Sequence, residues 1–308
     1  MSNTVYHYTS PSGIFNILKN KTLRFTDCQY LSDKGELIYI REPFEVAYKK
    51  IRKEHDKLTD DVEKITNNIL LSPYEHLSLG KSLECSETSN RLRIKFDYHR
   101  YYVLCASLNS DTANMWSYYV KNGVYRGYNI GIDINFIKEW FADYENDYIE
   151  FISGKVIYDK NEQIEMIYSK LKDLYSKYNA SEQSGIISND MFVDMFIDDL
   201  YEYIHKQKLF FKNPAFSSEE EYRFVLKINN EFPSNRNLSL DFRVGESGVI
   251  TPYVKWMFEL CEKEKIFKQI TLAPMIEADL AEESFKRFLA TTVQKNIEIK
   301  HSSIKLRY

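Results

Sequence analysis

The order of the predicted strands and helices restricts the fold of this chain more than any other feature of its sequence. Apolar or alternating strand patterns occur at residues 5–8, 22–26, 101–106, 128–134, 149–158, 222–228, 249–254, 266–272 and 297–300. Helical patterns follow Ser10 and Asp111 and cover residues 36–71, 161–179, 189–208 and 279–293. Because the helices do not separate the strands in regular βαβ order, we predict an α+β fold.

Three local signals fix helix ends within this pattern. Ser10 is placed to cap a helix whose first turn holds Pro11, where the missing N–H costs nothing. Asp111 is placed to cap the helix that carries Met115 and Trp116. We predict a break before Pro43 in the long helical stretch.

The length of 308 residues is enough for one large domain with a sizeable core. Aromatic residues make up 15% of the chain, which excludes disorder of the whole. The sequence has no internal repeat and no linker. We therefore predict a single domain over residues 1–308, with helical insertions near residues 36–75 and 160–208.

Charge and cysteine usage indicate the surroundings of the protein. The net charge of −4 does not favour a general nucleic-acid binder, although a local basic patch stays open. No stretch has the length and apolarity of a membrane span, and the first residues do not resemble a signal peptide. The four cysteines, at positions 28, 85, 105 and 261, have no metal-ligand spacing. We expect a cytoplasmic protein with no membrane partner and no metal.

The common catalytic signatures are absent from the sequence. It contains no P-loop, no dinucleotide-binding glycine pattern, no His-Glu-x-x-His and no Gly-x-Ser-x-Gly. Any site must therefore come from less familiar combinations of side chains.

The first such combination is Tyr-His-Tyr-Thr-Ser at residues 6–10. His7 and Thr9 are two apart on a predicted strand, so both side chains point to one side, where they can hydrogen-bond a ribose or an amide. A surface histidine beside an ordinary helix cap is the alternative.

The second is Glu-Glu-Glu-Tyr-Arg at residues 219–223. If the strand extends back far enough, Glu219 and Glu221 lie on one side, where their repulsion raises the pKa of one of them. One carboxylate can then stabilise a cation while the other orients a nucleophile. A solvated acidic loop is the alternative.

Two further segments offer binding groups. Residues 107–119 place Ser107 and polar neighbours between a buried strand and a helix with Trp116 and Tyr119, a common setting for a ligand pocket. We expect Trp116 to be a core residue. Arg243 can clamp a phosphate with two hydrogen bonds, or pair with a surface acid.

In chain order, several short motifs resemble a bacterial family known as domain of unknown function 2971. They are Tyr-His-Tyr-Thr at residues 6–9, Ser-Asp-x-x-Glu at 32–36, Cys-Ala-Ser at 105–107, Met-Trp-x-x-Tyr at 115–119, Val-x-Tyr at 156–158, Glu-x-Glu-Tyr-Arg at 219–223 and a closing Ser-x-Ile-x-x-Arg up to residue 307. Ala106 stands where the pattern has Phe, and Lys34 where it has Pro.

That family in turn looks like ADP-ribosyltransferases, and the resemblance implies a mixed β core of two packed sheets with peripheral helices. It further implies that NAD is the substrate. His7 and Thr9 would hold the nicotinamide ribose or amide, and Ser107 and Tyr119 would line the nicotinamide pocket. Glu221 would be the catalytic carboxylate, and Glu219 would position the acceptor.

The chemistry agrees with this resemblance, because nicotinamide is a good leaving group and its departure needs a carboxylate rather than a metal. The acceptor would be a protein or a nucleic acid, and hydrolysis of NAD is a close variant. Such an enzyme would suit a toxin or a phage-defence effector, with an antitoxin or regulatory partner.

Two alternatives from other classes stay open. Glu298-Ile299-Lys300, with Asp279 upstream, has the residue types of a metal-dependent nuclease. A non-catalytic module that binds a nucleotide or a partner is the other alternative.

Overall fold

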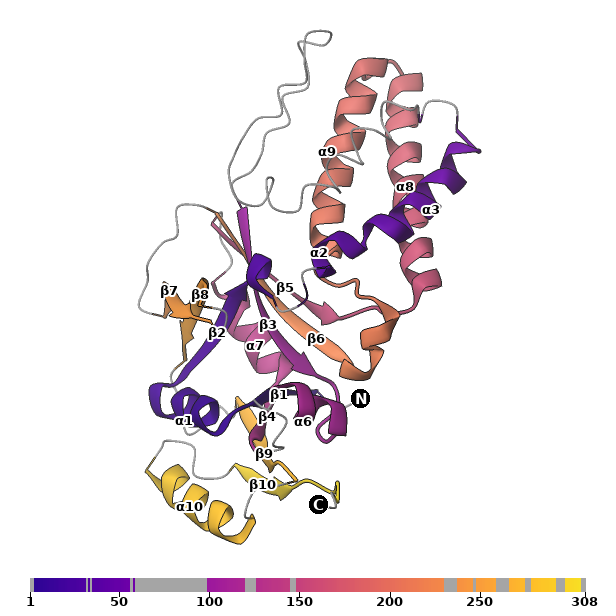
Figure 1. Cartoon of the computed structure of the whole chain (residues 1–308). Coiled ribbons are helices and arrows are strands. Elements are labelled where there is room, and N and C mark those ends of the chain that lie inside the picture. Colours follow the sequence, from indigo (N-terminus) through magenta and orange to yellow (C-terminus); the bar gives the residue numbers. More distant parts are fainter. Residues whose placement is uncertain are drawn as a thin grey trace. The chain divides into compact units, whose positions relative to one another are not determined.

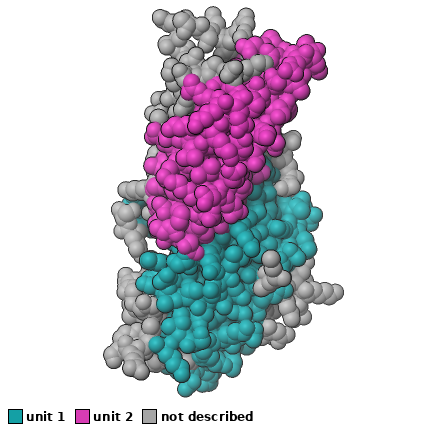
Figure 2. All heavy atoms as spheres, turned by 90° about the vertical axis from the view of Figure 1, so that its right-hand side faces the viewer, with its two compact units in different colours: residues 1–30, 101–155, 218–308 teal, residues 31–100, 156–217 magenta. Residues whose placement is uncertain are grey.

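A computed structural model gives the fold of the chain. It describes residues 3–31, 33, 35–55, 58, 99–119, 126–144, 148–229, 237–245, 248–258, 266–274, 278–291 and 297–305. The chain divides into two compact units, each built from stretches that are distant in sequence (Figure 2). Unit 1 consists of Met1–Tyr30, Tyr101–Lys155 and Ser218–Tyr308, and unit 2 of Leu31–Arg100 and Val156–Ser217.

Unit 1 contains a mixed sheet, which joins the predicted strands into one hydrogen-bonded framework (Figure 1). The strands are β1 (Thr4–Thr9), β2 (Thr22–Asp27), β3 (His99–Ser107), β4 (Tyr128–Asp133), β5 (Ile149–Lys155), β6 (Glu221–Asn229), β7 (Leu238–Val244), β8 (Ile250–Met257), β9 (Phe267–Leu272) and β10 (Glu298–His301). Their order is β10-β9-β4-β1-β3-β2-β8-β7, and β6 pairs with both β3 and β5.

The branch point of this sheet is β3, which pairs with β1, β2 and β6. Its partners β1 and β2 bond to different parts of the strand, since Tyr6 is opposite Ser107 and Thr26 is opposite Val103. The described strands therefore form one branched sheet, where we had expected two packed sheets. The α+β class is confirmed.

The described helices of unit 1 are α1 (Pro11–Asn20), α6 (Ala113–Tyr119), α7 (Ile134–Ala142) and α10 (Ala278–Ala290). The first three begin where short polar side chains accept hydrogen bonds from free N–H groups. Ser10 accepts from the Gly13 N–H at 3.1 Å, which confirms the predicted cap. The strand predicted to reach residue 134 stops at Asp133, because Asp133 accepts from the Asn135 N–H at 2.9 Å and caps α7.

Aromatic rings fill much of the unit 1 core. Phe25, Phe141 and Trp256 are fully buried, and the Phe141 ring lies 5.7 Å from Phe25 and 5.1 Å from Trp256. Burying rings of this size is a major source of stability in a folded domain. The core thus holds β2 and β8 against α7.

Unit 2 is helical and has its own apolar core. Its described helices are α2 (Glu36–Tyr39), α3 (Arg41–Arg52), α8 (Lys160–Gln183) and α9 (Asn189–Gln207). The predicted break near Pro43 falls at Ile40, and Pro43 occupies the first turn of α3, which tolerates it. Most of the predicted helix beyond residue 52 lies outside the described residues. Both predicted insertions fall largely within this unit.

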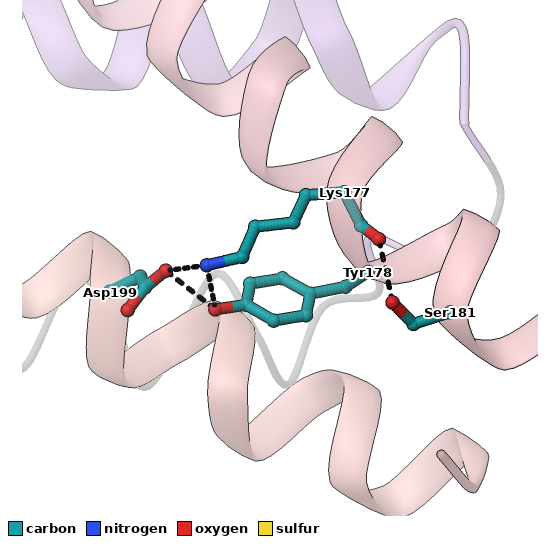
Figure 3. A network of polar contacts seen from close by, with 4 residues as sticks. All are labelled: Lys177, Tyr178, Ser181 and Asp199. Carbon is teal, nitrogen blue, oxygen red and sulfur yellow. Dashed lines mark hydrogen bonds and ion pairs between the residues drawn. The ribbon is translucent and has the colours of Figure 1, made fainter. Parts of the chain in front are cut away.

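A small polar network joins α8 to α9 (Figure 3). Asp199 accepts from Lys177 Nζ at 2.8 Å and from the Tyr178 hydroxyl at 2.5 Å, while Ser181 donates to the Lys177 carbonyl at 3.1 Å. Its charged side chains are about half exposed, so the network adds little to stability compared with the apolar core. Among the described residues, no helix combines the length and the apolarity needed to cross a membrane.

Candidate active site

His7 on β1 is held as a neutral imidazole. Its Nδ1 lies 3.0 Å from the Cys105 carbonyl, which can only accept, so Nδ1 carries the proton and Nε2 keeps a lone pair. Burial lowers the pKa of His7 below its ordinary value, and the Cys105 hydrogen bond opposes this only in part. At neutral pH the ring therefore offers Nε2 as a hydrogen-bond acceptor.

The neighbours of His7 on β1, Tyr8 and Thr9, contact the protein's own backbone and α1. The Tyr8 hydroxyl donates to the Asn109 carbonyl at 3.0 Å, and burial raises the pKa of Tyr8 to about 12. Thr9 lies against the first turn of α1, because its Oγ1 is only 2.0 Å from the place that a Cβ on Gly13 would take. Gly13 therefore allows this close approach of Thr9, and a larger residue there would displace it.

The two glutamates are buried, but not for the predicted reason. We expected strand alternation to put Glu219 and Glu221 on one side. Instead, Glu219 ends a 3₁₀ helix (Pro214–Glu219) and β6 begins only at Glu221. Glu220 between them has the left-handed φ of 44° and is exposed. Glu219 and Glu221 retain only 6% and 2% of their exposure.

Glu221 forms an ion pair with Arg223 on the same strand. Arg223 Nη2 lies 2.5 Å and its Nε 2.6 Å from Glu221 Oε2. The two side chains retain 3% and 1% of their exposure, so both charges lie within the protein interior. A buried carboxylate held by a guanidinium fork is a fixed negative charge, because the geometry leaves it few other orientations.

The end of β3 ties the region before β6 to the rest of unit 1. The buried Ser107 hydroxyl donates to the Glu219 carbonyl at 2.8 Å and accepts from the Asn109 N–H at 3.1 Å. The Leu108 N–H donates to the Glu220 carbonyl at 2.8 Å. Ser107 is also opposite Tyr6 of β1. The structure thus gathers the segments that carry His7, Ser107, Glu219 and Glu221 at one end of β3, with Ser107 as the residue that connects them.

Asp111 has a different role from the one we predicted. The N–H of Met115 faces Thr112 Oγ1 at 3.4 Å and that of Trp116 bonds the Thr112 carbonyl at 3.1 Å, so Thr112 begins α6. Asp111 instead accepts from Trp116 Nε1 at 2.7 Å and from Ser302 Oγ at 2.6 Å. It also accepts from the N–H and the hydroxyl of Ser303, at 2.7 and 2.8 Å.

This carboxylate fixes residues 302–304 against the loop that precedes α6. Burial alone would raise the pKa of Asp111, but the hydrogen bonds from Ser302, Trp116 and Ser303 outweigh it and hold the pKa below its usual range. Trp116 is fully buried and packs edge-on against Tyr8 at 4.6 Å, which confirms it as a core residue.

One predicted binding residue, Arg243, lies away from His7 and Glu221 along the sheet. Arg243 lies on β7, the third strand from β3 along the sheet, and is exposed. The side chain of Tyr119 lies outside the described part of the chain, although its backbone closes α6. Ser32, Lys34 and Arg307 of the family motifs also lie outside it.

Two features of the candidate site were not predicted from the sequence. Arg223 had a visible signal, since it stands two residues after Glu221 and shares its side of β6. The bond between Asp111 and Ser302 had none, because 191 residues separate them.

The described residues contain no group of three or more His, Cys, Asp or Glu side chains that could hold a metal ion. Of the nuclease candidates, Glu298 pairs with Lys300 at 3.2 Å and Asp279 lies in the first turn of α10. No described contact joins them.

Comparison with known protein families gives a match to part of the chain. Residues 115–224 match the family described as Protein of unknown function (DUF2971). This stretch is about a third of the chain and includes Glu219, Glu221 and Arg223, whereas His7 lies before it. The match supports the resemblance to that family. No curated protein and no solved structure matches the chain.

Proposed function

We propose that this protein cleaves NAD and transfers its ADP-ribose, as an ADP-ribosyltransferase or, with water as acceptor, an NAD glycohydrolase. One observation carries the proposal: a neutral His7 and a buried, ionic Glu221 are held by segments that meet at the same end of β3. Such a pair suits a reaction in which hydroxyl groups are bound and positive charge develops.

In the proposed reaction, the bond between nicotinamide and ribose C1′ breaks, and its electron pair leaves with nicotinamide. Glu221 stabilises the positive charge that develops on the ribose, while His7 Nε2 accepts a hydrogen bond from a ribose hydroxyl. Arg223 holds the Glu221 carboxylate in one orientation. The acceptor then supplies the new bond to C1′ and loses its proton, with Glu219 positioning it.

The first test is nicotinamide release from NAD by the purified protein, with Glu221→Gln and His7→Ala beside the native chain. We expect Glu221→Gln to lower the rate about 100- to 1,000-fold, because it removes the stabilising charge. Glu220→Gln is the matched control, since it changes an exposed acid one residue away. Release at the native rate by Glu221→Gln would overturn the proposal.

The pH dependence of kcat/KM tests His7 separately. The pKa of His7 is lowered, so we expect activity to be constant near neutral pH and to fall only when the pH drops below the ordinary histidine range. In His7→Gln, which keeps a hydrogen-bonding side chain, this acid limb should disappear. An acid limb that persists unchanged would assign the titration to another group.

The acceptor and the biological setting are part of the proposal. We propose a protein or nucleic-acid acceptor and a role as a cytoplasmic toxin or phage-defence effector, controlled by an antitoxin or other regulatory partner. Growth arrest on expression of the native chain, relieved by Glu221→Gln, would support this role. Unimpaired growth of cells whose lysate contains the active enzyme would refute it.

A further inference from the structure

A polar face on strands β2, β8 and β7 of unit 1 lies apart from the candidate active site. In antiparallel strands, residues directly opposite each other project from the same side of the sheet. Arg24 is opposite Lys255 and Thr26 is opposite Tyr253. On the next strand pair, Asp241 is opposite Tyr253 and Arg243 is opposite Thr251. Seven polar side chains therefore share one face.

Two guanidinium groups converge at the centre of this face. The Arg24 guanidinium lies over the Tyr253 ring, 4.9 Å from its centroid. Arg243 Nη2 lies 3.4 Å from Thr26 Oγ1. Because Thr26 and Tyr253 are a cross-strand pair, the two arginines lie over neighbouring points, although they come from strands separated by β8.

Neither arginine has a carboxylate within ion-pair distance among the described residues. The one acid on the face, Asp241, accepts from the Tyr253 hydroxyl at 2.9 Å and pairs with Lys255 at 3.6 Å. Partial desolvation and the charge of the nearby Arg24 lower the pKa of Arg243, as expected for two like charges close together. Both side chains are nevertheless exposed and accessible to a ligand.

We propose that Arg24 and Arg243 form a binding site for a phosphate group, supplied by a dinucleotide or by the backbone of a polynucleotide. A phosphate between the two guanidinium groups would replace their repulsion with charge-assisted hydrogen bonds. Thr26 adds a hydroxyl beside it. The proposal stands on this cluster alone and does not depend on NAD cleavage.

Pyrophosphate is the probe for the site, with binding measured by calorimetry at low salt. We expect Arg24→Gln and Arg243→Gln each to weaken binding about tenfold, because each removes charged hydrogen bonds. Arg243→Lys should fall between Arg243→Gln and the native chain, since it keeps the charge and loses the fork.

Lys255→Gln is the matched control, because it removes one positive charge from the same face but from a lysine that is paired with Asp241. We expect it to change pyrophosphate affinity about twofold at most. Equal weakening by Lys255→Gln, unchanged binding by the Arg24→Gln/Arg243→Gln double variant, or no pyrophosphate binding to the native chain would each overturn the site.

Two further arms identify the source of the phosphate. Binding of NAD is measured in a Glu221→Gln background, where turnover is slowed, and binding of a short single-stranded oligonucleotide is measured in the native chain. Weakening of NAD binding by Arg243→Gln assigns a dinucleotide, and weakening of oligonucleotide binding assigns a polynucleotide. If Arg243→Gln weakens neither, the proposed site is wrong. Failure of nicotinamide release would leave these binding results unaffected.

Discussion

Both units contain a buried ion pair, and the two pairs are built differently. In unit 1, Glu221 and Arg223 are two residues apart on one strand, with 2.5 Å between the charged atoms. In unit 2, Glu36 Oε2 and Lys212 Nζ are 3.8 Å apart and come from opposite ends of the unit's sequence. All four side chains retain 6% of their exposure or less.

The difference indicates what each pair contributes. The Glu36–Lys212 pair connects distant segments, so it can help to specify how unit 2 closes. The Glu221–Arg223 pair lies within one strand, so the ion pair itself does not join distant segments, yet it carries a comparable desolvation cost. Under the proposed function, the buried charge of Glu221 would instead act on a ligand.

The largest expected effect is from Arg223→Met. It leaves the Glu221 carboxylate buried without its guanidinium, so we expect the free energy of unfolding to fall by about 3–5 kcal/mol. Urea denaturation measures this loss. The control is Arg287→Met, which breaks an exposed pair within α10 and should change little. A loss no larger than that of the control would show that the Glu221–Arg223 pair is not buried as described.

Next in size is Lys212→Met in unit 2, for which we expect a loss of about 3 kcal/mol. Adding Glu36→Gln should recover part of that loss, because it removes the negative charge that Lys212→Met leaves buried without a cation. The decisive comparison is nicotinamide release: Glu36→Gln/Lys212→Met should retain it once folded, whereas Glu221→Gln/Arg223→Met should not. An equal loss of nicotinamide release in both double variants would contradict the proposal that only the Glu221–Arg223 pair serves function.

Asp111→Asn should have a smaller effect, about 1 kcal/mol, because the loop is partly exposed and an amide keeps some of the hydrogen bonds. The pKa of Asp111 is lower in the folded state than in the unfolded state. Its contribution is thus present above the ordinary aspartate range and is lost as the pH falls through that range, from about pH 5 downward. Melting temperatures of the native chain and the variant should converge there. A difference that grows toward acid pH would contradict this assignment.

The smallest effect is expected from Asp199→Asn in the α8–α9 network of Figure 3. Its charged side chains are about half exposed, so solvent screens the pair, and we expect the melting temperature to change by about 2 °C or less. Differential scanning calorimetry at low and high salt measures it. A larger shift would mean that this network, unlike an ordinary surface pair, holds unit 2 together.

The sequence predicted elements whose signals are local. The Ser10 cap, the core position of Trp116 and both long helices of unit 2 follow from residues within one or two turns of each other. The strand β7 was not predicted, although its sequence Leu-Ser-Leu-Asp-Phe-Arg-Val alternates.

What escaped prediction depends on contacts between distant residues. The left-handed turn at Glu220 interrupts the alternation expected between Glu219 and Glu221, and it is stabilised by Leu108 across more than 100 residues. The convergence of Arg24 on Arg243 likewise requires knowing that β8 lies between their strands. No local pattern encodes such pairings, because sheet order is decided by the whole core.

The interleaving of the two units sets an order for biosynthesis. All residues of the helical unit have left the ribosome once residue 217 has emerged from it. This is because that unit consists only of Leu31–Arg100 and Val156–Ser217. The sheet still lacks β6 and the strands that follow, and these include Glu221. Domains tend to fold as units during translation. The helical unit can therefore fold first, while the sheet is still incomplete. Nascent chains that stop short of residue 221 would carry His7 without Glu221, so under the proposed function they would lack activity.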